Sequence, residues 1–410
     1  MGRFWKFAQY LIIPMVGAAS PLLAIPAIAG SYGAEGWATV AIGQGVGGVG
    51  AVFVELAWGL TGPQLIARTT SRERLRVFVL ANACKGLIFL SVAPLCFATS
   101  YLIDSFEPIT CGLAAVSVAA TGMSPGWYFL GTGEPGKILI CETIPRVLLV
   151  LASSVAIMLG GWLTLNPISA LVSALVALTL SLHFIKRPAY AWRRISFSEV
   201  FATIRGQLGG LAARGVSAVY ISLPIPIVGI VNPGIVPEFS AIDRVLRLML
   251  VVLQAVPNSF QQWIGVRPND SRLGRQIWLV VALNSIIGLA VGVSFSLAGP
   301  WIVSVLFRNT IQASYMACAI GGLIVASVCA SRATGGLGLV RLNLISNLMI
   351  SAVVGACVGV VGLLAISPYL GVVGALVAEL FAEVAVLLFQ CFALVRCQKR
   401  EVASRRMEHV

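Results

Sequence analysis

Charge is scarce in this chain. Only 10% of its 410 residues are Asp, Glu, Lys or Arg, and it contains two histidines. A soluble globular protein is usually about 25% charged, so these few charges cannot cover a water-soluble fold of this size. Two histidines are also too few for a His-based metal cluster. The composition excludes a soluble protein and leaves lipid as the solvent for most of the chain.

The cysteines give no sign of disulfide bonds. The nine cysteines are an odd number and include no Cys-x-x-Cys spacing. Most lie in apolar stretches, where a thiol packs as a small hydrophobe. We therefore expect no disulfide framework, no metal site and no cofactor.

Long apolar runs are what the chain has instead, with 58% hydrophobic residues and a mean hydropathy of +0.95. A helix crosses the hydrocarbon core with about 20 apolar residues, and sheets with open edges are excluded because unpaired backbone groups in lipid are costly. The sequence predicts an all-α, polytopic membrane protein. Its twelve predicted spans are Phe7–Ala29, Trp37–Leu60, Val77–Ser100, Cys111–Leu130, Ile138–Gly160, Ile168–Phe184, Leu208–Val231, Ile242–Ile264, Ile277–Ala298, Ala313–Ala330, Leu342–Ile366 and Gly371–Val395.

The basic residues indicate the orientation, because Lys and Arg in short loops stay cytoplasmic. With both termini in the cytoplasm, Arg308 is the one basic loop residue that falls outside. The formal net charge of +13 then favours cytoplasmic rims beside anionic membrane lipids. Nucleic-acid binding is not expected, since no aromatic and basic domain lies outside the spans.

A basic, polar stretch near the middle divides six spans from six. We predict a first six-helix lobe at 1–185, a cytoplasmic linker at 186–207, a second lobe at 208–396 and a basic tail at 397–410. Because both halves enter the membrane from the same side, they form a parallel repeat around a central cavity.

Prolines interrupt the first span of each half. Pro21 and Pro26 lie in the first span, and Pro224 and Pro226 in the seventh. Proline kinks a helix, and interrupted helices at matching positions favour a binding site and bending in a transporter. The alternative is that membrane helices simply tolerate proline.

Charged residues inside predicted spans are costly, at about 2.5–3.5 kcal/mol each on insertion scales, and are usually paired or functional. Glu55 and Lys85 lie at similar depth on antiparallel neighbours. Glu142 and Arg146 are spaced i, i+4, as are Asp243 and Arg247. One interpretation is neutralised pairs that hold helices together.

The other interpretation is a ligand site. Arg214 has no acidic residue within a turn, although snorkelling to the interface would also accommodate it. Lys85, Arg146 and Arg214 are predicted in the cytoplasmic half of the membrane, and Arg244 and Arg247 in the outer half. Because a guanidinium binds phosphate oxygens bidentately, this set is predicted to bind a phosphate headgroup.

Glu379 and Glu383 are spaced i, i+4 near the middle of the last span. Two carboxylates on one face do not both ionise cheaply in a dry environment. With Glu55, they are candidates for coupling to Na⁺ or H⁺. They equally fit a pair that bonds neighbouring helices.

Three blocks of the sequence carry a family resemblance. The first is Tyr32–Arg68, with Glu55 near its Gly-rich end, the second is the aromatic segment Pro125–Gly131, and the third is Glu238–Arg267. In their order and spacing these blocks resemble the polysaccharide biosynthesis (Wzx-type) flippases of the MATE-like (MOP) transporter superfamily.

The resemblance implies two six-helix lobes that rock by alternating access in the bacterial inner membrane. It also implies an undecaprenyl-diphosphate-linked oligosaccharide as substrate, and polysaccharide polymerase or assembly proteins as partners. We expect a monomer. Small residues at 43–50 allow close helix approach or lipid entry.

Two rival functions stay open. The first is a cation-coupled drug or metabolite antiporter of the same fold. The second is a membrane enzyme of glycan assembly, such as a polymerase or ligase. The loops between spans are too short to hold an extramembrane catalytic domain, so we expect a transporter and no catalytic residues.

Overall fold

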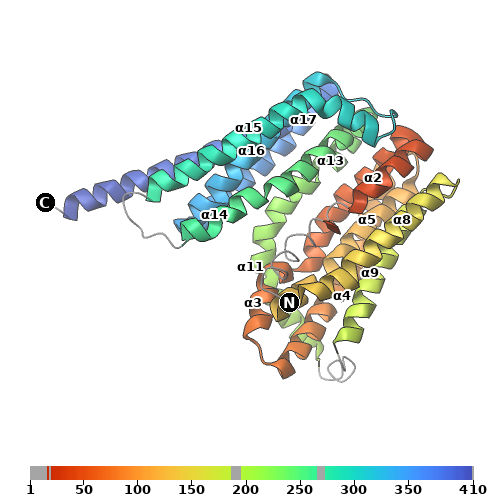
Figure 1. Ribbon diagram of the computed structural model, residues 1–410. Helices are drawn as coiled ribbons and strands as arrows, with labels where there is room; N and C mark the ends of the chain where they lie inside the picture. The colour runs from red at the N-terminus through yellow and green to blue at the C-terminus, as the bar shows by residue number, and fades with distance from the viewer. Residues whose placement is uncertain (1–15, 18–19, 186–194, 266–272, 409–410) are drawn as a thin grey trace. The chain divides into compact units, whose positions relative to one another are not determined.

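A computed structural model describes residues 16–17, 20–185, 195–265 and 273–408 and divides the chain into two compact units, Met1–Ile230 and Val231–Val410 (Figure 1). Every regular element in this described part is helical, which confirms the predicted all-α fold class. Eight helical segments of the described residues are long and apolar enough to cross a membrane. One of them, Ser20–Arg68, contains the end of the first predicted span and all of the second, and another, Ile345–Gln398, covers most of the eleventh and all of the twelfth. Residues 7–15 and 18–19 of the first predicted span lie outside the described residues, and the count of twelve stays a prediction.

Unit 1 is a helical bundle in which α2 packs against α4, α5 and α8, and α9 packs against α5 and α8 (Figure 1). The third and sixth predicted spans appear as α4 and α9. Its helices are α2 (Ile25–Glu55), α3 (Trp58–Arg68), α4 (Ser71–Ile103), α5 (Pro108–Ala120), α6 (Gly126–Thr132), α7 (Pro135–Ile138), α8 (Ile144–Met158), α9 (Leu165–Phe184), α11 (Phe197–Ser222) and α12 (Pro224–Val231).

Glycines let α2 approach its neighbours closely. A Cβ added at Gly43 would lie 2.4 Å from the Cys111 carbonyl oxygen of α5, and one at Gly47 would lie 2.3 Å from the carbonyl oxygen of Ala115. Both distances are far shorter than a real contact. The predicted close helix approach in the 43–50 region is therefore present between α2 and α5.

The seventh predicted span packs within unit 1 as α11 and α12. Gly45 of α2 makes room for Pro226, since a Cβ there would lie 2.6 Å from the proline Cδ, and Gly48 faces Ser222. This packing puts the boundary between compact units after Ile230, whereas the predicted linker at 186–207 precedes the span. The predicted lobes and their parallel repeat stay predictions.

Unit 2 is built around α16, which packs against α13, α15 and α17. Gly292 and Gly322 face each other, since a Cβ on either would lie 2.3 Å from the carbonyl oxygen of the other. The unit's helices are α13 (Val236–Leu253), α14 (Ala255–Gly265), α15 (Leu273–Leu306), α16 (Tyr315–Ala333) and α17 (Ile345–Glu408).

Two pairs of predicted spans are joined by a single glycine rather than by a loop. The first pair meets within α2 at Gly33, where φ is +67°, and the last pair meets within α17 at Gly371, where φ is +58°. Left-handed backbone is inexpensive only for glycine. The predicted loops at 30–36 and 367–370 are thus helical apart from these two breaks.

We expect Gly47→Ala to destabilise the protein, because its new Cβ meets backbone of α5 that cannot move aside. Overpacking of this kind costs about 1–3 kcal/mol. Thermal unfolding in detergent measures the loss. Gly86→Ala is the matched control, since nothing lies within 4 Å of its added Cβ. Equal melting temperatures for the two variants would contradict the close α2–α5 packing.

Glu238, before the predicted eighth span, gives a pH-dependent prediction. Burial raises the pKa of its carboxyl, although a hydrogen bond from the Ser314 backbone N–H opposes the shift. A carboxyl whose pKa is raised in the folded state costs stability that sets in as the pH rises above the unfolded-state pKa and is complete above the folded-state pKa. Glu238→Gln keeps the acceptor and should raise the melting temperature at pH 8. The gain should shrink as the pH falls toward the ordinary Glu value of about 4.3; a gain that grows on acidification would contradict it.

Candidate functional site

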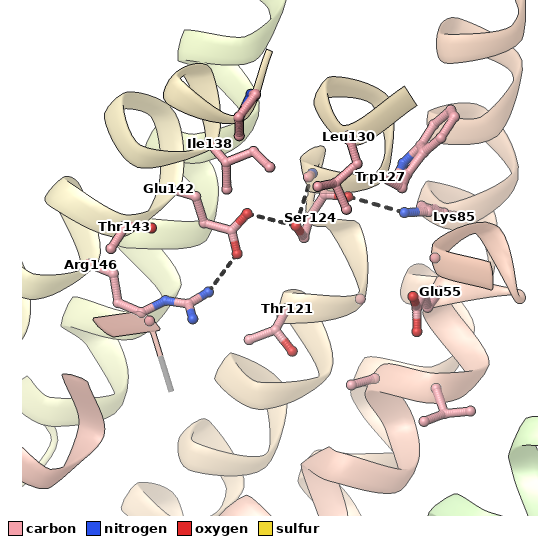
Figure 2. Close-up of a pocket in the computed structure, with 17 residues that line it drawn as sticks. Glu55, Lys85, Thr121, Ser124, Trp127, Leu130, Ile138, Glu142, Thr143 and Arg146 are labelled. Atoms are coloured by element: carbon pink, nitrogen blue, oxygen red, sulfur yellow. Dashed lines mark hydrogen bonds and ion pairs between the residues drawn. The ribbon is translucent and has the colours of Figure 1, made fainter. Parts of the chain in front are cut away.

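A cavity of about 510 Å³ lies within unit 1. Four charged side chains line it, two acidic and two basic: Glu55, Lys85, Glu142 and Arg146 (Figure 2). A pocket of roughly 300–1,000 Å³ holds a small-molecule-sized group. The structure therefore brings three of the predicted site residues, Glu55, Lys85 and Arg146, into one cavity of the first unit.

The cavity lies where three helices lose their regularity. After Glu55, Leu56 and Ala57 take positive φ values of 52° and 61° before α3 begins. The fourth predicted span is broken by a 3-10 turn at Thr121–Met123, and a π-helical turn at Leu139–Thr143 precedes α8. Strained non-glycine backbone and π turns both concentrate at functional sites. All three breaks contribute lining residues.

Glu142, in the π turn, organises one wall. Its carboxylate accepts a hydrogen bond from Arg146 Nη2 at 2.9 Å, which confirms the ion pair predicted from the i, i+4 spacing. The other carboxylate oxygen accepts from Ser124 Oγ at 2.7 Å (Figure 2). The break between α5 and α6 and the start of α8 are thus joined through one side chain.

Lys85 of α4 reaches the same wall from the other side. It is 1% exposed, and its Nζ donates to the Ser124 backbone carbonyl at 3.2 Å (Figure 2). The ammonium also lies 5.6 Å from the centroid of the Trp127 ring, a cation–π contact. Ser124 therefore contacts both Lys85 and Glu142, so the two cations belong to one polar network.

Trp127 forms the aromatic side of the cavity. It is 4% exposed, its ring lies 5.0 Å from that of Trp58, and it stacks on Phe78 at 6.2 Å. A Cβ added at Gly62 would lie 2.4 Å from the indole, so the ring is tightly enclosed. The indole nitrogens of Trp127 and Trp58 are buried without a hydrogen-bond partner. A buried N–H group that makes no hydrogen bond costs about 1–3 kcal/mol. The fold alone therefore does not explain why the Trp127 N–H is buried here.

Sequence reasoning missed Ser124 and Trp127 as site residues. The segment Pro125–Gly131 was noted only as a resemblance. A usable signal was present, because Ser124-Pro125-Gly126 interrupts an apolar span that otherwise has no reason to break. Backbone freed from a helix at membrane depth is tolerated where it lines a cavity.

The other predicted charges gather in unit 2. Arg247 Nε donates to Asp243 at 2.5 Å, which confirms the second i, i+4 pair, and Asp243 is 5% exposed. Glu379 and Glu383 of α17 lie near enough to act electrostatically on Arg247. Arg244 adjoins the pair and interacts with both of its members. Glu379 and Glu383, two of the three predicted coupling residues, thus form one charged cluster within unit 2 with the predicted outer cations Arg244 and Arg247. The third predicted coupling residue, Glu55, lines the cavity of unit 1.

The remaining predicted residues are placed but not explained. Pro21 lies in a 3-10 turn at Ser20–Ala24, and Pro26 begins α2. Pro224 begins α12, and Pro226 packs on α2. Arg214 belongs to α11, but its side chain is outside the described part of the structure. The conformational role of the prolines stays a prediction.

The fold is similar to that of solved MATE family transporters and of a lipid II flippase. The similar structures include an inward-facing multidrug resistance MATE family transporter of the MOP superfamily, with a TM-score of 0.68, 15% identity and coverage of 98% of this chain and 99% of that one. They also include the lipid II flippase MurJ in an inward closed conformation, with a TM-score of 0.63, 12% identity and coverage of 95% and 87%. A MATE in the bent conformation has a TM-score of 0.54 at 12% identity and covers 99% and 97%. No family model and no curated protein matches the sequence.

These neighbours are transporters and flippases rather than enzymes. Their identities are too low to carry more than the fold to this chain. The likeness agrees with a multi-pass membrane protein of the MATE-like architecture that the sequence predicted. It leaves the Wzx-type subfamily and the substrate as proposals.

The unit 2 cluster yields a stability prediction. Arg247→Gln should leave Asp243, Glu379 and Glu383 without the cation that they share. Asp243 is buried but the Arg247 side chain is 33% exposed, so we expect a loss of about 1–3 kcal/mol, less than for a fully buried pair. Arg76→Gln is the matched control, because Arg76 pairs with Glu199 where both side chains are substantially exposed. An exposed pair contributes about 0–1 kcal/mol. Chemical unfolding of both variants in detergent measures the difference, and similar small losses would argue against a buried cluster.

Proposed function

We propose that this protein is a flippase that moves an undecaprenyl-diphosphate-linked oligosaccharide across the bacterial cytoplasmic membrane by alternating access. The observation that carries the proposal is the polar cavity of unit 1, where Lys85 and Arg146 lie among membrane-length helices. Cations at such depth are expensive and are retained for a ligand or a pathway. A headgroup phosphate is the anion that both side chains fit.

The polar residues that line the cavity support the proposal that the headgroup carries sugars. Glu55, Glu142 and hydroxyl-bearing residues such as Thr121 and Thr143 line it beside the cations. Carboxylates accept hydrogen bonds from sugar hydroxyl groups, and hydroxyl side chains both donate and accept. The solved lipid II flippase of the same fold also supports this substrate class. The polyprenyl tail remains in lipid while the headgroup crosses.

We further propose that the unit 2 cluster couples transport to Na⁺ or H⁺. Glu379 and Glu383 face Arg247 and Asp243, so the cluster holds three carboxylates. A change in the occupancy of one carboxylate changes the electrostatic balance of the whole cluster. Glu55 is the corresponding candidate in unit 1.

The rival with specific support is a cation-coupled drug or metabolite antiporter. A multidrug MATE transporter shares the fold, and two carboxylates line the unit 1 cavity. Such a site would favour cationic, aromatic ligands, with Trp127 as a stacking surface. A glycan-assembly enzyme is the weaker rival, and turnover of lipid-linked glycan by the purified protein would establish it.

Deletion of the gene in its source bacterium tests the proposal. We expect lipid-linked oligosaccharides to accumulate, as measured by mass spectrometry of extracted lipids, and surface glycan to fall. In the deletion strain, Lys85→Gln and Arg146→Gln should each give export at least about tenfold lower than the wild-type gene does. Each variant loses a charge-assisted contact of roughly 1.5–3 kcal/mol. Arg76→Gln, outside the cavity, should restore it.

The same strains distinguish the rival. Raised drug susceptibility on deletion, with unchanged surface glycan and no accumulated intermediate, would favour the antiporter and refute the flippase. Immunoblots of membrane fractions must show that each variant reaches the membrane in normal amount.

A further inference from the structure

Glu142 occupies the position that an anionic ligand of this cavity needs. One carboxylate oxygen accepts from Arg146 at 2.9 Å, and the other accepts from Ser124 Oγ at 2.7 Å. The Ser124 carbonyl in turn accepts from Lys85 at 3.2 Å. Figure 2 shows this chain of contacts running along the cavity wall from Arg146 to Lys85. The protein's own carboxylate is therefore already bound to the guanidinium.

An incoming anion must compete with that carboxylate. A monophosphate that replaces Glu142 on Arg146 exchanges one charge-assisted hydrogen bond for another of the same kind. It also leaves the Glu142 carboxylate inside the cavity near a second negative charge. The four charged lining residues balance formally, two against two, so the cavity offers a single negative charge little net attraction.

We propose that Glu142 is a specificity-determining residue that makes the cavity select diphosphates over monophosphates. The inference rests on the proposed function, in which the cavity receives a phosphate headgroup. Selection follows because discrimination is achieved by building a cost against the wrong ligand as well as contacts to the right one. Here the cost is the displacement of Glu142.

A diphosphate offsets this cost because it engages two cations at once. One phosphoryl group binds the Arg146 guanidinium bidentately, and the second reaches toward Lys85 along the wall that Ser124 connects. A monophosphate that displaces Glu142 gains only the first contact. Glu142 thus disfavours monophosphates relative to a diphosphate headgroup.

The same geometry explains why the carboxylate lies in a π turn. The Leu139–Thr143 turn interrupts α-helical spacing directly before α8, and both Glu142 and Thr143 contribute to the lining. The Ser124 hydroxyl donates to Glu142 and also accepts from the Gly126 backbone N–H at 3.1 Å. Glu142 is therefore held on the cavity wall from two helical segments rather than left to rotate into lipid.

Isothermal titration of the purified full-length protein in detergent tests the proposal, with inorganic phosphate and inorganic pyrophosphate as probes at fixed ionic strength. The wild type should bind pyrophosphate at least about tenfold more tightly than phosphate, a difference of about 1.4 kcal/mol. Glu142→Gln retains the shape and an acceptor for Ser124 but removes the charge. It should bind phosphate about tenfold more tightly than the wild type and lose most of the preference.

Two further variants keep the result interpretable. Ser124→Ala removes one of the two bonds that hold the Glu142 carboxylate, so its preference should lie between those of the wild type and Glu142→Gln. Glu199→Gln neutralises a carboxylate that pairs with an arginine outside the cavity and should leave the preference unchanged. If Glu142→Gln does not fold, Ser124→Ala alone decides the matter.

An unchanged pyrophosphate preference in Glu142→Gln and Ser124→Ala would overturn the inference. Arg146→Gln separates this failure from that of the proposed function. If pyrophosphate binding depends on Arg146 but the preference does not depend on Glu142, only the inference is wrong. If pyrophosphate does not bind, or binds equally well to Arg146→Gln, the phosphate site itself is wrong and both fail.

Discussion

The constraint on which this structure depends is that lipid offers no hydrogen bonds to the backbone. Each membrane-length segment must satisfy its own N–H and carbonyl groups, which helices do and irregular chain does not. Departures from the α-helix are therefore informative in unit 1. Three of them, after Glu55, at Thr121–Met123 and at Leu139–Thr143, border the same cavity. The backbone groups freed at these breaks need the polar cavity as their surroundings, and the breaks in turn supply residues that line the cavity.

Charge follows the same logic in both units. Arg146 and Arg247 each carry a carboxylate one helical turn before them, so the helix itself supplies the first neutralising partner. The second layer of partners comes from other helices. Ser124 and Lys85 complete the network of unit 1, while Glu379 and Glu383 of α17 complete that of unit 2. Locally neutral pairs make insertion tolerable, and the contacts between helices give each cluster its shape.

The sequence predicted those features that depend on near neighbours along the chain. Long apolar runs identified α9 within three residues at each end and identified α4 and α15, which extend further than their predicted spans, and i, i+4 spacing identified both ion pairs. It did not predict the left-handed backbone at Leu56 and Ala57 or the π turn, because tertiary packing imposes both against local preference. The placement of Trp127 beside Lys85 depends on contacts between α4 and α6, which no pattern within either segment encodes.

Helix length has a consequence for the membrane in which this protein works. With a rise of 1.5 Å per residue, the 20 residues of α9 extend about 30 Å, close to one hydrocarbon thickness, whereas the 33 residues of α4 extend about 50 Å. In a thicker bilayer α4 is still long enough to cross the hydrocarbon core, whereas α9 becomes shorter than the core. Because α9 packs against the π turn that carries Glu142, a hydrophobic mismatch at α9 acts directly beside the polar cavity. Bilayer thickness thus acts on this protein through α9, the shortest of the eight membrane-length segments of the described residues.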